Sequence, residues 1–513
     1  MTQWAGGYVF DIEYSSGFYV EQTPAHIDAA CLVRGVEPPV EPGAPFTYCE
    51  LGCGLGETAM VVAATNPQAQ VWAFDFNPAH IARAQALAQL TGLDNLRLEE
   101  RSFADLNGPD APDMPLFDYV TLHGVWTWIS AENQNHIVRF LQRHVRPGGV
   151  VCISYNSLPG WAPAVPVQKL LHATTRLDPT RSDFKMRTAI ELTDAISKAG
   201  SIAFDAKAVD DLKMHVQEGR ISYLVHEYLN DHWRPVFQTD VAASLSEAKL
   251  EFSATATMVE NFPKLCLTEA QLAIVDASPT ALREMMKDYF TLRPFRRDIY
   301  VRGRRSMGAR RLHDRLRMHN LTVVVPPSTI KFKIDVPLGE AELHQKFYGP
   351  AFSALTEGVR AVGEMLDLPA AAGSTITAQE VIGMTIASRQ VMSAPNDITP
   401  VKLNRIRAFN LVRLRHCAQE GRVTMALAGV ALGAGVTVRL FEMLAYETLV
   451  LGTPEDVESV SQAALKLLQM RGDRLRNEEK ELVDPAETLA VLRTNMQDVL
   501  ANALPMWRRI GAI

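Results

Sequence analysis

The chain has 513 residues, more than one hydrophobic core usually organises, so several domains are expected. Hydrophobic residues make up 47% of it and charged residues 21%, which excludes a globally disordered protein. The formal net charge of -7 excludes a general attraction to nucleic acid or anionic lipid. The six cysteines are scattered, and no basic segment followed by an apolar run opens the chain. We therefore expect reduced thiols and a cytoplasmic protein without membrane insertion.

Residues 46–156 alternate short β-rich runs with longer helical runs. This order is typical of a doubly wound, Rossmann-like α/β sheet. The strands are predicted at 46–51, 70–76, 96–100, 117–123 and 149–155, with helices between them that include 59–65 and 130–144. The helix after the second strand has clear ends, because Asn77 can cap it, Pro78 suits its first position and Gly92 can stop it.

After residue 161 the sheet pattern fades and helical patterns prevail. An arginine-rich segment with short β-like runs at 298–301, 322–325 and 330–336 then leads into further helices up to Trp507. The apolar stretch 424–438 is shorter than the roughly 20 residues that span a bilayer, and a buried helix or helix-turn is predicted there. We expect a sheet domain at 1–165 followed by largely helical accessory domains at 166–290 and 291–513.

The first predicted strand runs into the turn Glu50-Leu51-Gly52-Cys53-Gly54-Leu55-Gly56. Glycines between a strand and a helix let backbone N–H groups approach a ligand closely, which suits any nucleotide. A dinucleotide fingerprint would need its third glycine where this chain has Glu57. Glu50 would repel a pyrophosphate but suits a ligand that carries an ammonium group. Cys53 is expected to fill the turn rather than to act as a nucleophile.

Asp75 ends the second predicted strand. A carboxylate there can accept hydrogen bonds from both hydroxyls of a ribose. S-adenosylmethionine carries both the ribose that Asp75 would bind and the ammonium group that Glu50 would bind. Two plainer interpretations stay open: the glycines could form a mere tight turn, and Asp75 could accept from the N-terminus of the next helix.

Residues 48–155 resemble a class I S-adenosylmethionine-dependent methyltransferase. The resemblance rests on the glycine turn, on Glu50 and Asp75, and on the Pro147-Gly148-Gly149 turn at the expected distance along the chain. The resemblance implies that the glycine turn lines the methionine part of the cofactor, that Asp75 and Phe76 meet the ribose, and that Ser102 and Phe103 contact the adenine. The family commonly has an acid where Ser102 stands. The predicted cofactor-binding residues are Glu50, Gly52, Cys53, Gly54, Gly56, Asp75, Phe76, Ser102, Phe103, His123, Gly124 and Val125.

Motifs on both sides of this stretch extend the resemblance. Tyr14-x-Ser16, His123-Gly124-Val125-Trp126 and Tyr155-Asn156-x-x-Pro159-Gly160-Trp161 are similar to a bacterial subgroup with a methyltransferase regulatory domain. Tyr223-Leu224-x-His226-Glu227-Tyr228-Leu229 is similar to that domain's own motif. Some members of the subgroup are lysine methyltransferases of bacterial outer-membrane proteins. The resemblance therefore implies a protein substrate and leaves room for a homodimer, although Gln22-Thr23 departs from the Thr-His expected before Pro24.

Methyl transfer requires alignment and a dry site more than acid-base groups, because the cofactor already activates the methyl carbon. Aromatic faces can stabilise a sulfonium, and Trp126, Trp128 and Tyr19 belong to segments expected at the sheet edge, although ordinary packing explains each equally well. A lysine acceptor must first lose a proton. The predicted catalytic and acceptor-positioning residues are Tyr14, Trp126, Tyr155 and Asn156.

His226 and His232 would lie on different faces of a helix, so cap or surface roles are predicted for them and no metal site is expected. The arginine-rich segment 293–317 admits nucleic acid as one interpretation. Aromatic residues are sparse after Tyr300, however, which favours a solvated face, an acidic partner within the chain, or an acidic protein substrate.

Three functions stay open from the sequence. The first is a methyltransferase that acts on a protein side chain, namely lysine. The second is a methyltransferase for a small-molecule acceptor, with the helical region as a lid. The third is a module that binds the cofactor without turnover and holds a partner through its arginines.

Overall fold

The computed structural model describes residues 6–12, 17–204, 206–477 and 480–513. A seven-stranded sheet forms its centre, with the strand order β3-β2-β1-β4-β5-β7-β6. Strands β1 to β5 pair in parallel, whereas β7 is antiparallel to both of its neighbours. The strands are β1 (Thr47–Leu51), β2 (Gln70–Asp75), β3 (Leu96–Glu100), β4 (Phe117–Leu122), β5 (Val145–Asn156), β6 (Leu250–Thr255) and β7 (Phe295–Arg302).

The five predicted strands and the doubly wound, Rossmann-like fold are confirmed. The sheet also takes in β6 and β7, which no local pattern had joined to it. The predicted domain borders at 165/166 and 290/291 therefore divide one sheet, because β6 lies before the second border and β7 after it. Both strands pair with partners far along the chain, and such pairing leaves little local signal in the sequence.

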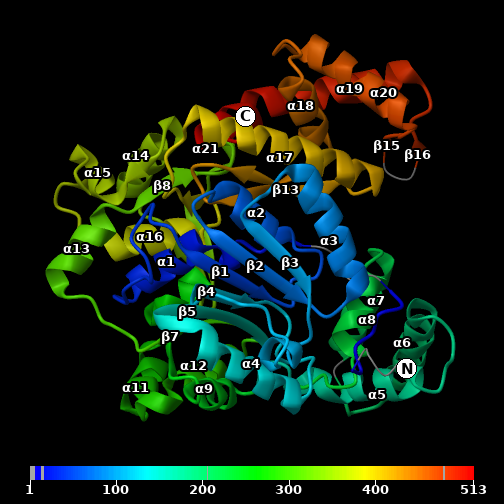
Figure 1. Ribbon diagram of the computed structural model, residues 1–513, viewed down its shortest axis with the longest axis vertical. Helices are drawn as coiled ribbons and strands as arrows, with labels where there is room; N and C mark the ends of the chain where they lie inside the picture. The colour runs from blue at the N-terminus through cyan, green and yellow to red at the C-terminus, as the bar shows by residue number, and fades with distance from the viewer. Residues whose placement is uncertain (1–5, 13–16, 205, 478–479) are drawn as a thin grey trace.

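Helices cover both faces of the sheet (Figure 1). Alternate strand residues point to opposite faces. Tyr48 of β1 lies in one core cluster with α1 (Pro24–Val33), α2 (Glu57–Thr65) and α3 (Pro78–Thr91). The next residue, Cys49, lies in a second cluster with α4 (Ala131–His144) and α9 (Gln238–Ser246). The helices thus form the two outer layers that a doubly wound sheet requires.

The helix ends predicted around α3 are confirmed. The side chain of Asn77 accepts a hydrogen bond from the N–H of Ala79 (3.0 Å), and Pro78 is the first helical residue. Gly92 ends the helix in the left-handed conformation, with a φ of 67°. α3 is thereby fixed directly after the end of β2, at the edge of the sheet where the strands' carboxyl ends lie.

Residues 165–228 form a helical lobe beside the sheet (Figure 1). It has a small core of its own, which includes Leu171, Met186 and Leu224. Its helices are α5 (Val165–Thr175), α6 (Ser182–Lys198), α7 (Ala206–Gln217) and α8 (Ile221–Tyr228). Between β6 and β7 the chain forms α10 (Pro263–Cys266), α11 (Glu269–Ala277) and α12 (Arg283–Thr291).

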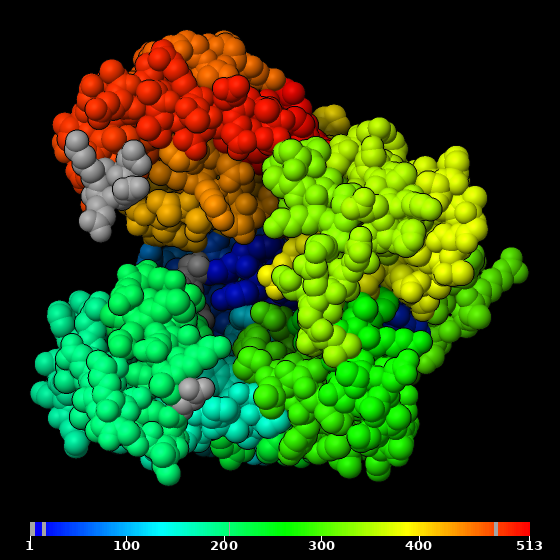
Figure 2. All heavy atoms as spheres, turned by 180° about the vertical axis from the view of Figure 1, so that it is seen from behind, coloured from blue at the N-terminus to red at the C-terminus, as the bar shows by residue number. Residues whose placement is uncertain are grey.

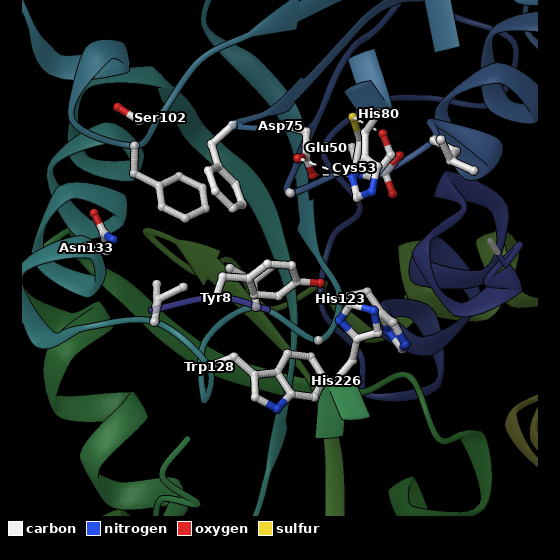
Figure 3. Close-up of a pocket in the computed structure, with 18 of the residues that line it drawn as sticks. Tyr8, Glu50, Cys53, Asp75, His80, Ser102, His123, Trp128, Asn133 and His226 are labelled. Atoms are coloured by element: carbon white, nitrogen blue, oxygen red, sulfur yellow. Dashed lines mark hydrogen bonds and ion pairs between the residues drawn. The ribbon is translucent and has the colours of Figure 1, made fainter. Parts of the chain in front are cut away.

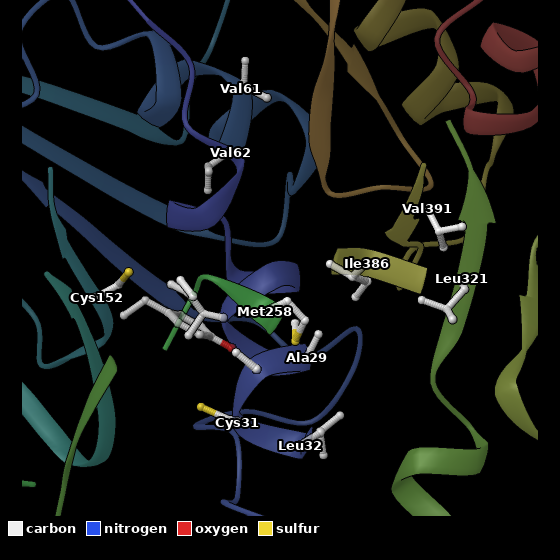
Figure 4. Packing of buried hydrophobic residues seen from close by; sticks show 14 of the residues in the cluster. Ala29, Cys31, Leu32, Val61, Val62, Cys152, Met258, Leu321, Ile386 and Val391 are labelled. Atoms are coloured by element: carbon white, nitrogen blue, oxygen red, sulfur yellow. The ribbon is translucent and has the colours of Figure 1, made fainter. Parts of the chain in front are cut away.

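After β7 the chain packs against the face of the sheet that carries α1 and α2. Figure 4 shows Val61 and Val62 of α2 in one cluster with Leu321, Ile386 and Val391. The elements of this part are α13 (Ala309–Arg317), β8 (Asn320–Val323), β9 (Lys333–Val336), β10 (Gly339–Glu342), α14 (Gln345–Glu357), β11 (Arg360–Ala361), α15 (Val362–Leu366), α16 (Ala378–Ala387) and β12 (Val391–Ser393).

Residues 400–513 form the C-terminal lobe, which has a core cluster built mainly from its own residues. Its elements are α17 (Pro400–Gln419), β13 (Thr424–Gly429), β14 (Ala434–Arg439), α18 (Leu440–Val450), α19 (Val457–Arg471), β15 (Arg476–Asn477), β16 (Lys480–Glu481), α20 (Pro485–Asp498) and α21 (Leu504–Ile510). No described helix combines the length and apolarity that crossing a membrane requires.

The helix or helix-turn predicted at 424–438 is wrong. The stretch forms an antiparallel hairpin, in which Thr424 pairs with Arg439 and Gly429 with Ala434. The hairpin packs against α2 and α17 and is buried over most of its length. Burial on both faces removes the alternation of polar and apolar residues by which a strand is recognised, so a short apolar run reads equally well as a helix.

Candidate functional site

A cavity lies at the carboxyl ends of β1 to β4, and Figure 3 shows the side chains around it. This edge of an open α/β sheet is where ligands generally bind. Every predicted cofactor-binding residue except Gly56 lines the cavity. The residues predicted to bind the cofactor thus lie together around one cavity. Their contacts with the cofactor remain predictions.

The glycine turn forms one wall of the cavity. Gly52, Gly54 and Gly56 all have left-handed backbones, with φ values of 71°, 55° and 69°. A Cβ atom on Gly52 would lie only 2.6 Å from Cγ2 of Val125. Gly56 sits behind the wall, where it immediately precedes α2 and where a Cβ atom would crowd Leu98. A turn of this shape therefore requires glycine at these positions.

Asp75 fastens this turn to the end of β2. One carboxylate oxygen, Oδ2, accepts a hydrogen bond from the N–H of Gly54 (2.8 Å), and Oδ1 accepts one from the N–H of Asn77 (2.9 Å). His80 Nδ1 lies 3.6 Å from Oδ1. Each oxygen of a carboxylate can accept more than one hydrogen bond, so Asp75 can hold the turn and still bind a hydroxyl group in the cavity.

Glu50 is a buried carboxyl group in the same wall. Its Oε2 accepts a hydrogen bond from the N–H of Ala59 (3.0 Å). With the Gln22 amide oriented to suit its neighbours, Nε2 donates to Glu50 Oε1 at 3.2 Å and Oε1 accepts from the N–H of His123 at 3.2 Å. Burial raises the pKa of Glu50 to about 8, and the charge of Asp75 adds to the rise. Among the described residues no lysine or arginine pairs with Glu50, so a cationic ligand would suit it.

The N-terminal segment 6–12 lies across the cavity. The ring of Tyr8 meets the edge of Phe76, with 5.7 Å between the ring centroids, and lies 5.6 Å from the ring of His226. In Figure 3 Tyr8 crosses the middle of the cavity, between the acids Glu50 and Asp75 and the indole of Trp128. The segment thus supplies an aromatic cover.

Residues of α8 and the loop after it hold this segment in place. The N–H of Val9 donates to Asn230 Oδ1 (3.1 Å), and the N–H of Asp231 donates to the carbonyl of Gly7 (3.0 Å). His226 Nε2 lies 2.9 Å from the carbonyl oxygen of Ile12. The helical lobe therefore helps to close the cavity.

The cap or surface role predicted for His226 is wrong. The residue is 3% exposed and lines the cavity, because α8 turns it toward the N-terminal segment. Neither Tyr8 nor Asn230 was expected at the site. Their positions depend on contacts between segments far apart in the chain, which a linear pattern does not encode. The only sequence signal was the regulatory-domain motif that contains His226.

His123, directly after β4, forms another part of the wall. It stacks on Tyr19, with 3.7 Å between the ring centroids, and Ser154 Oγ lies 3.0 Å from its Nδ1. Burial and the positive charge of Arg297 together lower the pKa of His123 to about 4. The imidazole is therefore neutral near pH 7.

Three predicted catalytic residues do not line the cavity. Trp126 is 2% exposed and packs in the core beside α4. The hydroxyl of Tyr155 donates to Asp298 Oδ2 at 2.5 Å. The Asn156 side-chain amide donates to Glu227 Oε1 at 2.6 Å. These contacts place Trp126 in the core and join Tyr155 and Asn156 to β7 and α8, and the catalytic roles given to the three residues stay predictions.

Tyr14, the fourth predicted catalytic residue, lies outside the described residues. The other aromatic candidates from the same segments, Tyr19 and Trp128, do line the cavity. Trp128 lies against Gly124, where a Cβ atom would overlap the indole ring.

Arginines of the segment 293–317 form ion pairs with acidic residues of the same chain. Arg296 is fully buried and pairs with Asp288 (2.8 Å) and Asp298 (2.9 Å). On α13, Arg311 pairs with Glu41 at 2.8 Å. Of the interpretations given for this segment, the acidic partner within the chain is the one that the structure shows for these arginines. Among the described residues no group of three or more His, Cys, Asp or Glu side chains is arranged to hold a metal ion.

Comparisons with known proteins agree with this geometry. A model described as a methyltransferase domain matches residues 44–228, and one described as a predicted methyltransferase regulatory domain matches residues 220–302. An uncharacterized protein of Synechocystis sp. is 31% identical over 515 residues, which cover 99% of each chain. The chain belongs to this family of methyltransferases with a regulatory domain. It is an S-adenosylmethionine-dependent enzyme, which decides against a module without turnover.

The methyltransferase also has the fold of a solved structure over nearly its whole length. PKMT2 from Rickettsia typhi in complex with AdoHcy matches with a TM-score of 0.69 and 17% identity, over 96% of this chain and 98% of that chain. The trans-aconitate 2-methyltransferase of Deinococcus radiodurans is 32% identical over 104 residues, which cover 20% of this chain and 35% of that one. The likeness to PKMT2 thus includes the accessory lobes.

Proposed function

We propose that the methyltransferase transfers a methyl group to a lysine side chain of a protein acceptor. The observation that carries this proposal is the fold shared with PKMT2, a protein lysine methyltransferase, across the sheet, the helical lobe and the C-terminal lobe together. Accessory lobes of this size suit an acceptor that is itself a folded or extended chain, because a small metabolite needs no such surface.

The cavity fits the cofactor. The open space beside Gly54 would admit its methionine part close to the backbone, Glu50 would bind its ammonium group, and Asp75 would bind its ribose hydroxyls. Ser102 and Phe103 line the cavity beyond β3, where the adenine would lie. The buried carboxyl group of Glu50, which has no cationic partner among the described residues, is the feature that favours a cationic ligand over a plain nucleotide.

When bound, the cofactor supplies a methyl carbon that its sulfonium already activates. The chain's task is then to align an acceptor and keep the site dry. We place the acceptor amine beside the stacked rings of Tyr19 and His123, which are uncharged and line the cavity. A lysine buried against such a wall loses its proton more readily, because burial disfavours the ammonium form.

Figure 2 shows a hollow in the surface that suits a protein acceptor. It is bordered by the helical lobe in green, by the C-terminal lobe in orange and red, and by the yellow-green region around α14 to α16, and blue N-terminal chain forms its floor. A polypeptide segment lying in this hollow would meet the N-terminal part of the chain, which also supplies Tyr8 and Tyr19 to the cavity.

A small-molecule acceptor is the second candidate, and one observation favours it. His226 and Asn230 of the helical lobe region line the cofactor cavity and hold the N-terminal segment across it. A lid that excludes water from a small substrate would be arranged in this way.

Incubation with methyl-labelled S-adenosylmethionine distinguishes the two candidates. The purified enzyme is given a bacterial cell-envelope fraction and, separately, a protein-free metabolite extract. The proposal expects label in protein bands, and mass spectrometry of those bands should find methylation on lysine. An Asp75→Ala variant, impaired in cofactor binding, serves as the matched background. Label confined to the metabolite extract, or methylation of a side chain other than lysine, would overturn the proposal.

A further inference from the structure

The C-terminal lobe reaches the wall of the cofactor cavity through a buried ion pair. Glu57 is the first residue of α2, lines the cavity and is 6% exposed. Arg413 of α17 is fully buried and pairs with Glu57 Oε2, and Arg422, in the loop after α17, donates to Glu57 Oε1 at 2.8 Å. Arg413 also donates to the carbonyl of Ala426 in β13 (2.8 Å), which fixes the guanidinium on its own side.

The C-terminal lobe and the segment just before it hold the other end of α2. The side chain of Asn66 donates to the carbonyl of Gly433 in the β13–β14 turn (3.2 Å). Asn396 donates to the carbonyl of Thr65 (3.3 Å) and to Asn66 Oδ1 (3.2 Å). All nine residues of α2 are buried between these contacts. The helix that begins at the glycine turn is thus held at both ends by residues from the last quarter of the chain.

We propose that Arg413 and Arg422 are positioning residues for the cofactor site, acting through Glu57. The physical reason is electrostatic as well as geometric. The cofactor's amino-acid part carries a carboxylate besides its ammonium group, and an uncompensated charge on Glu57 would repel that carboxylate. The two guanidinium groups compensate the charge of Glu57 and fix the first turn of α2, and the N-terminus of a helix favours a negative charge. The inference rests on the cofactor placement proposed above, not on the acceptor.

Arg422→Gln is the variant that tests the proposal, and Arg415→Gln is its matched control. Arg422 is 25% exposed, so its loss is compatible with folding, whereas Arg415 lies on the same helix as Arg413 but pairs with Glu447 (3.0 Å) inside the C-terminal lobe. Isothermal titration of AdoHcy, without acceptor, reads out cofactor affinity directly. Arg422→Gln is expected to weaken AdoHcy binding by about five- to fiftyfold, which lies within the usual range for coupling between two sites. Arg415→Gln is expected to leave the affinity within about twofold of the wild type.

A double-variant cycle tests whether the effect passes through Glu57. In a Glu57→Gln background, removal of Arg422 should change AdoHcy affinity by less than about twofold, because the charge on which it acts is gone. Arg422→Lys should recover much of the lost affinity by restoring the cation.

Unchanged AdoHcy affinity in Arg422→Gln would overturn the proposal. So would losses that simply add in the double variant, or an equal loss in Arg415→Gln. Failure of lysine methylation with these affinities shifted as expected would instead refute the acceptor assignment alone. Arg413→Met adds a second test if that variant folds. If it does not fold, the AdoHcy affinity of Arg422→Gln still decides whether the arginines position the cofactor site.

Discussion

Asp75 has two duties in the cavity wall. It holds the glycine turn through the N–H of Gly54, and in the proposed complex it also binds the ribose. Its place at the end of β2 was predictable, since a strand followed by an Asn-Pro helix start fixes where the carboxylate falls. That one side chain also closes the turn could not be predicted, because the contact depends on the three-dimensional path of the loop.

Asp75→Ala should weaken AdoHcy binding by about 1.5–3 kcal/mol, since charge-assisted hydrogen bonds are lost. Isothermal titration measures the change. Asp110→Ala, at an exposed position, is the control and should leave the affinity unaltered. Equal affinities for the two variants would mean that the cofactor does not contact Asp75.

Glu50 should make the stability of the cofactor-free enzyme depend on pH. Its pKa rises from an ordinary 4.5 to about 8 on folding, so the folded state holds a proton that the unfolded state releases between these values. The contribution of Glu50 is therefore complete below about pH 4.5 and is lost as the pH rises through about 8. Glu50→Gln cannot lose a proton and should escape this loss.

Thermal unfolding of the cofactor-free wild type and Glu50→Gln, from about pH 6 to about pH 9, measures this effect. The Tm of the wild type relative to the variant should fall as the pH rises. A difference that stays constant across the range would contradict a raised pKa for Glu50. The other groups that titrate in this range are common to both proteins, so they cancel in the comparison.

At the scale of elements, the parallel strands were predictable and the two that follow were not. β1 to β5 alternate with helices at short range, and this alternation is a strong local pattern. β7 inserts antiparallel between β5 and β6 after a long excursion. β7 carries Arg296, which lies between the carboxylates of Asp288 and Asp298 with no exposure to solvent.

Arg296→Met should destabilise the protein by about 3–5 kcal/mol, because it removes the cation that pairs with the buried carboxylate of Asp298, whereas Asp288 keeps its pair with Arg293 (2.6 Å). Denaturant or thermal unfolding measures the loss. Arg305→Met provides the comparison, since that side chain is 63% exposed and its pair with Glu37 at 3.7 Å is worth about 1 kcal/mol at most. Comparable effects of the two substitutions would show that the cluster around Arg296 contributes little.

At the scale of the whole molecule, the role of the last third of the chain could not be predicted from the sequence. Its residues contain no motif that joins them to the cofactor turn, and the pairing of Glu57 with Arg413 spans most of the chain. The apolar run 424–438 indicated a buried segment in this part of the chain. Only the packing of its hairpin against α2 shows why it is apolar on both faces.

Residues 1–399 expressed alone should be insoluble or unable to bind AdoHcy, since removal of the C-terminal lobe uncovers α2, all of which is buried in the complete protein. Soluble yield and AdoHcy titration provide the measurements. Co-expression of residues 400–513 as a separate chain should restore both. A soluble 1–399 fragment that binds AdoHcy as tightly as the full chain would show that the lobe is dispensable for the site.

Glu57 and the two arginines that pair with it are far apart in the sequence, so they are synthesised at different times. A ribosome delivers all seven strands of the sheet once residue 302 has emerged, but Arg413 and Arg422 follow more than a hundred residues later. Until then α2 has neither its cover nor the counter-charge for its first residue. The residues that pair with Glu57 are therefore synthesised after every strand of the sheet.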